Sequence, residues 1–158
     1  MKLNINKQAP TFSLPDQNNN IVCLSDFYGK WILLYFYPKD DTPGCTKEAC
    51  EIRDVWSRFK KAGIEVFGVS VDSVKSHQKF LNKYKLPFTL LADEDKKVVK
   101  LYGVWGKKKF MGREYFGVKR ESFLLNPKGK IVKIYDDVKP AEHAKEVLTD
   151  VKELNLFN

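Results

Sequence analysis

Two cysteines five positions apart, Cys45 and Cys50, are the residues of this chain best placed to do chemistry. The preceding Thr42-Pro43 pair predicts a helix start, because Thr is a good N-cap and Pro suits the first helical position. Cys45 then falls in the first helical turn, where unpaired N–H groups and the positive dipole end stabilise a thiolate. The thiolate is the nucleophilic form of cysteine. Cys45 is therefore a candidate nucleophile, and a buried structural cysteine is the alternative.

The neighbours of Cys45 fit such chemistry. Thr42 can place a hydroxyl beside the sulfur as hydrogen-bond donor and acceptor. Pro38 has no N–H and stiffens the approach, which helps to keep bulk water away. At ~100° per residue, Cys45 lies on the apolar face of the helix, whereas Cys50 lies about 140° around, toward solvent. The other members of that apolar face are Ala49, Ile52, Trp56 and Phe59.

Cys45 and Cys50 cannot be joined while the helix is intact. Helical geometry sets their Cα atoms ~8.7 Å apart, and a disulfide needs less than ~7 Å. A bond between them therefore requires the first turn or two to unwind.

A zinc site is a weaker alternative, because it needs about four ligands and the remaining candidates, Cys23, His77 and His143, are scattered. A thioredoxin-type Cys-x-x-Cys pair does not occur.

Length and composition bound the class of protein. The chain has 158 residues, 43% hydrophobic and 30% charged, which predicts one globular domain spanning residues 1–158. Its longest apolar run, Trp31 to Tyr37, is far shorter than the ~20 residues that span a bilayer. The N-terminus lacks the features of a secretory signal. Three cysteines are too few for a disulfide framework, so we expect a cytoplasmic protein.

The net charge of +8 is concentrated in one stretch. From Lys96 to Arg120 there are nine basic residues and one acidic residue, Glu114. A solvated lysine face is the common reason for such a stretch. Nucleic-acid binding and attraction of small anions or an acidic partner are the alternatives. With no nucleic-acid motif and no spanning segment, we expect neither nucleic acid nor membrane as a partner.

The order of elements predicts an α/β fold. Parallel strands from crossover units, an antiparallel hairpin at one side and an added N-terminal strand region fit a thioredoxin-like arrangement with a central mixed sheet flanked by helices. Ligands bind outside the carboxyl ends of strands in such sheets, which again selects the junction from Tyr37 to Cys45. Strands are expected at 21–24, 31–37, 64–71, 88–91, 121–125 and 130–135; helices at 42–63, 73–85, 96–102 and from about 140 to 154; and an irregular segment at 103–117.

The active-site segment also resembles a known family. Tyr37-Pro38-Lys39-Asp40-Asp41-Thr42-Pro43-Gly44-Cys45-Thr46-Lys47-Glu48-Ala49-Cys50 closely resembles that of the peroxiredoxin Q group, also called bacterioferritin comigratory proteins. The Pro-x3-Thr-x2-Cys pattern is general to peroxiredoxins, and a second Cys five residues on marks this subgroup. The likeness covers nearly the whole chain. It extends through the segments 69–73, 76–77, 86–88, 102–106 and 117–120.

The resemblance implies a thiol-dependent peroxidase. Cys45 would be the peroxidatic nucleophile toward hydrogen peroxide and alkyl hydroperoxides, passing through a sulfenic acid, and Cys50 the resolving cysteine that forms an intramolecular disulfide. Thr42 would hold the peroxide, Pro38 would shield the sulfenate, and Arg120 would stabilise the thiolate and the transition state. Glu48 would orient Arg120, or else be a solvated charge. Thioredoxin or a similar dithiol protein would be the reductant, with no metal or other cofactor.

Some features depart from the family pattern or stay open. The family usually reads Ser-Thr-Phe after the arginine, where this chain has Glu121-Ser122-Phe123. Cys23 is expected to be structural, and His77 and His143 to be surface or hydrogen-bonded residues. The resemblance also implies a monomer. A redox sensor or relay that uses the same cysteine pair is the alternative to a peroxidase.

Overall fold

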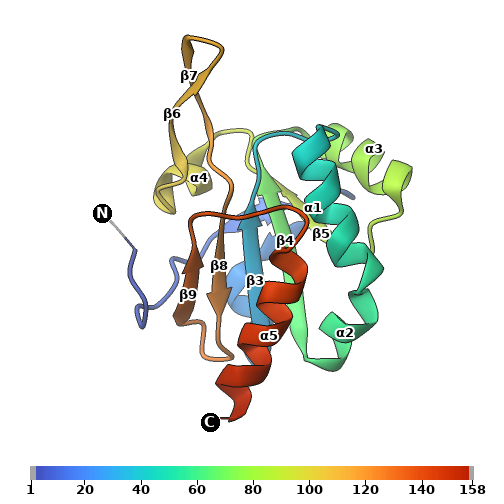
Figure 1. Ribbon diagram of the computed structural model, residues 1–158, viewed down its shortest axis with the longest axis vertical. Helices are drawn as coiled ribbons and strands as arrows, with labels where there is room; N and C mark the ends of the chain where they lie inside the picture. Colours follow the sequence, from blue (N-terminus) through green and yellow to red (C-terminus); the bar gives the residue numbers. More distant parts are fainter. Residues whose placement is uncertain (1–2, 157–158) are drawn as a thin grey trace.

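A computed structural model describes residues 3–156 of the chain (Figure 1). The elements are, in order, β1 (Ser13–Pro15), β2 (Ile21–Cys23), the 3-10 helix η1 (Leu24–Phe27), β3 (Trp31–Phe36), α1 (Pro43–Asp54), α2 (Trp56–Lys61), β4 (Ile64–Ser70), α3 (Val74–Tyr84), β5 (Thr89–Ala92), α4 (Lys97–Leu101), β6 (Trp105–Phe110), β7 (Arg113–Val118), β8 (Glu121–Leu125), β9 (Ile131–Tyr135) and α5 (His143–Leu156).

A five-stranded mixed sheet forms the centre of the fold. Its strand order is β5-β4-β3-β8-β9. Strands β3, β4 and β5 are parallel, whereas β8 runs antiparallel to β3 and β9 antiparallel to β8. The N-terminal strands β1 and β2 form a small separate antiparallel pair. The predicted α/β, thioredoxin-like arrangement with an N-terminal addition is confirmed.

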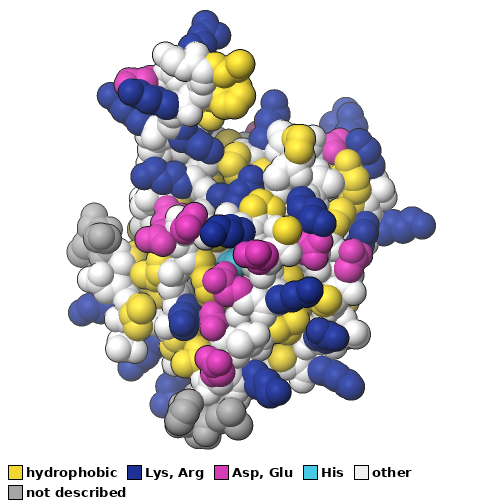
Figure 2. Space-filling view, in the orientation of Figure 1, with side chains coloured by type: hydrophobic (Ala, Val, Ile, Leu, Met, Phe, Trp, Pro, Cys, Tyr) yellow, Lys and Arg dark blue, Asp and Glu magenta, His cyan; other side chains and the backbone are white. Residues whose placement is uncertain are grey.

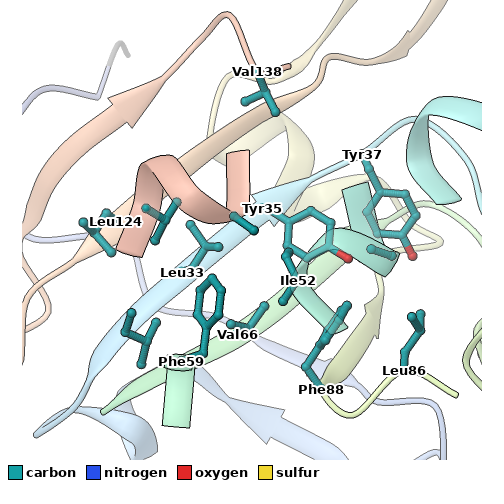
Figure 3. Close-up of a cluster of buried hydrophobic side chains, with 14 of the residues drawn as sticks. Leu33, Tyr35, Tyr37, Ile52, Phe59, Val66, Leu86, Phe88, Leu124 and Val138 are labelled. Carbon is teal, nitrogen blue, oxygen red and sulfur yellow. The ribbon is translucent and has the colours of Figure 1, made fainter. Parts of the chain in front are cut away.

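Two apolar layers enclose this sheet. Alternate side chains of β3 point to opposite faces, so Leu33 and Tyr35 pack on one side while Ile32 and Leu34 pack on the other. Helices α1, α2, α3 and α5 cover the first face, and α4 with the N-terminal segment covers the second. Figure 3 shows the first layer, where Ile52 of α1 approaches Tyr35. Because β3 is buried on both faces, its continuous apolar run is explained.

The helix predicted to run from Thr42 to Gly63 is two helices. Val55 interrupts it with non-helical backbone angles, φ −116° and ψ 23°, and α2 restarts at Trp56. Val55 is β-branched, which lowers its preference for the helix interior. After the break, Trp56 stacks on Phe59 with ring centroids 6.2 Å apart. The apolar spacing predicted the buried face, but the prediction of one continuous helix was wrong.

The segment 103–117, predicted to be irregular, contains most of a regular hairpin. Strands β6 and β7 pair antiparallel from Trp105↔Val118 to Phe110↔Arg113. Met111 and Gly112 make the turn with φ values of +52° and +79°, as in a type I′ turn. The hairpin projects from the rest of the molecule (Figure 1).

No helix among residues 3–156 is long and apolar enough to cross a bilayer.

Candidate active site

Cys45 lies where the central strand feeds the first helix. Strand β3 ends at Phe36, a short loop follows, and α1 begins at Pro43. The Cys45 side chain is only 1% exposed and packs in the same apolar layer as Tyr35 and Ala49. Its position in the first turn of α1 and its burial on the apolar face agree with the sequence prediction. The free N–H groups of this turn favour an anion at the sulfur.

Arg120 supplies the cationic partner of Cys45. It lies between β7 and β8, directly before Glu121, and its Nη2 donates to Cys45 Sγ at 3.5 Å. Its Nη1 donates to Oε1 of Glu48 at 2.8 Å. One planar guanidinium therefore joins a sulfur and a carboxylate, which suits the fixed fork of arginine donors. The structure brings together three of the residues predicted for the site.

Glu48 is a buried carboxyl group, not a solvated charge on the helix face. It is 1% exposed, and its Oε2 has no hydrogen-bond partner among the described residues. Burial raises the pKa of Glu48 from 4.5 to about 7, against the opposing effect of Arg120. The phenol oxygen of Tyr35 is a second buried oxygen with no hydrogen-bond partner within residues 3–156. Burial, together with the negative charge of Glu48, raises the pKa of this phenol.

Gly44 makes room for the guanidinium, a role that sequence reasoning did not find. A Cβ at this position would lie 2.8 Å from Arg120 Nη2 and 3.9 Å from Pro140 Cγ. Real Cβ atoms do not approach other heavy atoms so closely. Any side chain at Gly44 would therefore displace Arg120 from the first turn of α1.

Thr42 and Pro38 lie in the loop before α1. Thr42 Oγ1 donates to the carbonyl oxygen of Lys39 at 2.9 Å. Its proton is thus engaged, and its lone pairs are left to accept a hydrogen bond. Thr42 is the N-cap residue by backbone conformation, but its side chain caps no N–H group. Pro38 is half-buried and lies two residues after the end of β3.

A buried hydrogen-bond network holds this loop in place. Asp40 accepts hydrogen bonds from Tyr37 Oη at 2.5 Å and Ser76 Oγ at 2.8 Å. Nδ1 of His77 lies 2.7 Å from Asp40 Oδ2, and Nε2 lies 2.8 Å from the Leu91 carbonyl oxygen. The carbonyl can only accept, so Nε2 carries a proton, and another proton lies between Nδ1 and Asp40. The sequence left open whether His77 is a surface residue or a hydrogen-bonded one. The structure shows that it is buried and hydrogen-bonded.

His143, the second histidine, is also buried and hydrogen-bonded. Its Nε2 lies 2.8 Å from Ser122 Oγ, and its Nδ1 lies 3.1 Å from Glu146 Oε1. Burial lowers the pKa of His143. It begins α5, and so it ties this helix to β8.

Only one cluster within residues 3–156 has metal-ligand spacing. Ligand atoms of Asp40, Asp72 and His77 lie within 4.8 Å of one another. Asp72 Oδ2 already accepts from the Asp40 N–H and from Ser70 Oγ, at 2.9 and 2.7 Å. These contacts use the facing atoms to hold the loop, so the donor set fits a loop anchor better than a metal site.

All three cysteines are free thiols in this structure. Cys50 is half-buried and lines a surface cavity of about 440 Å³ beside the loop. Burial raises the pKa of the Cys50 thiol, which keeps it protonated. Cys23 lies in β2, with Sγ 3.3 Å from Ser25 Oγ. The buried Cys45 thiol beside Arg120 is therefore separate from the half-buried Cys50 thiol, which faces the surface cavity.

Fold and site together define a thiol-based redox protein on a thioredoxin-like scaffold. Residues 5–134 match the AhpC/TSA family, and the chain belongs to this family. It is similar to peroxiredoxin Bcp of Escherichia coli K12, with 50% identity over 92% of this chain and 93% of the relative. It is also similar to peroxiredoxin Bcp of Bacillus subtilis, with 42% identity over 98% and 99% of the two chains.

Solved structures give the same assignment. A mutant of Xylella fastidiosa PrxQ superposes with a TM-score of 0.92 and 34% identity, covering 98% of this chain and 99% of that one. The bacterioferritin comigratory protein of Xanthomonas campestris, which has alkyl peroxide reduction activity, superposes with a TM-score of 0.84 and 37% identity over 90% of both chains. The chain is a peroxiredoxin, an oxidoreductase that acts as a thiol peroxidase.

Proposed function

We propose that this peroxiredoxin reduces hydrogen peroxide and organic hydroperoxides through Cys45, with Cys50 as resolving cysteine and thioredoxin or a similar dithiol protein as reductant. The observation that carries the proposal is the Arg120 guanidinium 3.5 Å from the buried Cys45 sulfur at the first turn of α1. A fixed cation and a helix N-terminus both favour the thiolate and the negative charge that develops on the peroxide.

In the first step the Cys45 thiolate attacks one oxygen of the peroxide. An S–O bond forms while the O–O bond breaks, and the second oxygen leaves as water or alcohol with the peroxide proton. The sulfur is oxidised by two electrons to a sulfenate, which takes up a proton from solvent to become the sulfenic acid. Arg120 donates to the reacting oxygens, the free lone pairs of Thr42 accept from the peroxide, and Pro38 limits access of water. Glu48 positions the guanidinium through its 2.8 Å contact.

In the second step the Cys50 sulfur attacks the Cys45 sulfur. The S–S bond forms, the S–O bond breaks, and the oxygen leaves as water. Because an intact helix holds the two residues too far apart, the start of α1 unwinds first. Unwinding also exposes Cys50, whose burial in the closed helix disfavours its thiolate. The reductant then exchanges its two thiols for this disulfide and is itself oxidised.

Mass spectrometry of the reduced protein after one equivalent of hydrogen peroxide tests both cysteines. We expect wild type to lose two hydrogens, with the bond mapped to Cys45 and Cys50. The Cys50→Ser variant should hold a sulfenic acid at Cys45, and the matched Cys23→Ser variant should behave as wild type. An unresolved sulfenic acid in wild type would remove Cys50 from the cycle. No reaction in either protein would refute the peroxidase assignment of Cys45.

The reductant and the assembly state are tested separately. Turnover with thioredoxin and its reductase should be sustained, and a single turnover without recycling would favour the sensor or relay alternative. The monomeric state, the cytoplasmic location and the absence of a cofactor stay predictions from the sequence. Size-exclusion chromatography of the reduced protein checks the first of these.

A further inference from the structure

The β6–β7 hairpin carries an unusual concentration of exposed apolar side chains. Phe110 is 67% exposed, Met111 88%, Phe116 59% and Tyr115 45%. These four make up most of the large hydrophobic side chains exposed among the described residues. Figure 2 shows apolar and basic side chains gathered on the projecting arm. By the strand register, Phe110 and Tyr115 share one face of the hairpin and Phe116 lies on the other. Exposed apolar side chains gathered on one projecting element mark an interaction site.

The turn of this hairpin holds a bulky residue in a conformation that it disfavours. Met111 has a φ of +52°, in the left-handed region. Type I′ turns need positive φ at both central positions, for which Asn-Gly is the favoured pair. A methionine there adds strain and packs against little, because it is almost fully exposed. The exposed Met111 side chain adds no packing that would offset this backbone strain. A methionine at this position therefore points to a function of its side chain.

Cations surround this apolar tip. The hairpin from Trp105 to Val118 has four cationic side chains and one carboxylate. Lys107, Lys109 and Arg113 are exposed. The carboxylate belongs to Glu114, which lies 3.9 Å from Lys109 Nζ. Since successive residues of a strand point to opposite faces, both faces of the arm carry positive charge.

We propose that this hairpin docks the protein on an anionic membrane surface. Phe110 and Met111 would enter the headgroup region, and the cations behind them would face lipid phosphates, a combination that gives reversible surface binding. The hairpin projects from the molecule (Figure 1), so it can contact a membrane surface, which needs no complementary groove. A second copy is a poor partner, because it would set one basic arm against another on a chain of net charge +8.

Docking by this arm also sets the orientation of the protein. The hairpin rises from the end of the sheet at which α1 begins (Figure 1). Its last strand ends at Val118, two residues before Arg120. The active site is therefore at the end of the molecule nearest the membrane. The proposal replaces the sequence-based expectation of no membrane partner, which rested on the absence of a spanning segment, and it does not depend on the roles of Cys45 and Cys50.

Co-sedimentation with lipid vesicles tests the proposal. The probes are vesicles of phosphatidylcholine alone and of phosphatidylcholine with phosphatidylglycerol, at low and at high salt. We expect binding only to the anionic vesicles, weakened by salt. Reversing two charges in Lys107→Glu/Lys109→Glu should weaken binding by about tenfold or more. The matched reversal Lys145→Glu/Lys152→Glu on α5 should leave binding near the wild-type value.

The Met111→Asn variant separates docking from folding. Asparagine suits the left-handed turn, so the melting temperature should rise by a few degrees. Loss of the exposed apolar side chain should nevertheless weaken vesicle binding by about fivefold. The control Ile21→Ser removes another side chain that is 70% exposed, and it should change vesicle binding little.

Three outcomes would overturn the proposal. One is equal binding to both kinds of vesicle, or to neither. Another is equal loss of binding in the control variants. The third is a concentration-dependent dimer that the hairpin variants abolish, which would make the arm a self-association surface. Peroxidase activity of Met111→Asn with hydrogen peroxide should stay at the wild-type value, so failure of docking and failure of the catalytic assignment are distinguishable.

Discussion

Glu48 should make the stability of the folded protein depend on pH in an unusual direction. Burial raises its pKa from 4.5 to about 7, so the folded state prefers the protonated carboxyl group. The stabilisation that comes from this preference is fully present below pH 4.5, which is the pKa of Glu48 in the unfolded chain. As pH rises from there to about 7, the unfolded chain releases the proton first, and folding loses about 1.4 kcal/mol per pH unit. The total loss is about 3 kcal/mol.

The Glu48→Gln variant isolates this effect. Its amide oxygen can still accept from Arg120, but it cannot titrate. We expect the free energy of unfolding of wild type, relative to the variant, to fall by about 3 kcal/mol between pH 4.5 and neutrality. Urea unfolding of the reduced proteins at a series of pH values measures it. His143, whose pKa is lowered by burial, titrates in both proteins, so its contribution cancels in the comparison.

Parallel stability curves for the two proteins would refute the reasoning. They would mean that Glu48 ionises in the folded state as it does in water, and that Arg120 fully offsets the effect of burial. A difference that grows with pH in favour of wild type would mean that the ion pair outweighs burial. Either result would change the account of how the guanidinium is held.

Three further substitutions test other contacts. Arg120→Lys removes the planar fork that joins Cys45 and Glu48, and the rate constant with hydrogen peroxide, measured by stopped flow, should fall about 100-fold. Gly44→Ala should slow the same reaction by displacing the guanidinium, while the urea midpoint stays the same or rises slightly because alanine favours helix. His77→Ala removes the imidazole that shares a proton with buried Asp40 and leaves this carboxyl group only the hydroxyl donors of Tyr37 and Ser76; a loss of about 3 kcal/mol or more in urea unfolding is expected. A wild-type rate for the first two, or a wild-type unfolding midpoint for the third, would contradict these assignments.

Local patterns in the sequence were sufficient for the elements that lie next to the site. The apolar run of β3 and the Thr42-Pro43 helix start placed Cys45 in the first turn of a buried helix face. Arg120 is 75 residues away from Cys45 in the chain, and no periodicity links the two. Its role was inferred only from the family resemblance, as was the pairing with Glu48.

Other parts of the site leave no trace in a single sequence. The function of Gly44 depends on where a distant guanidinium lies, and the Asp40–His77 contact joins residues 37 positions apart. The β6–β7 hairpin was missed for a local reason. Its lysine-rich strands do not alternate apolar and polar residues, and Met-Gly replaces the Asn-Gly pair that would have signalled the turn.

The break at Val55 has a consequence for how the redox cycle and the folded core are coupled. Helix–coil transitions are cooperative along an uninterrupted hydrogen-bond ladder, and Val55 ends the ladder of α1. In the proposed cycle, α1 can lose its first turns while the Trp56–Phe59 stack of α2 stays packed. Val55→Ala, which favours a continuous helix, should therefore slow disulfide formation after the sulfenic acid appears, with both cysteines untouched. The speed of resolution and the stability of the core can thus be tuned by different residues.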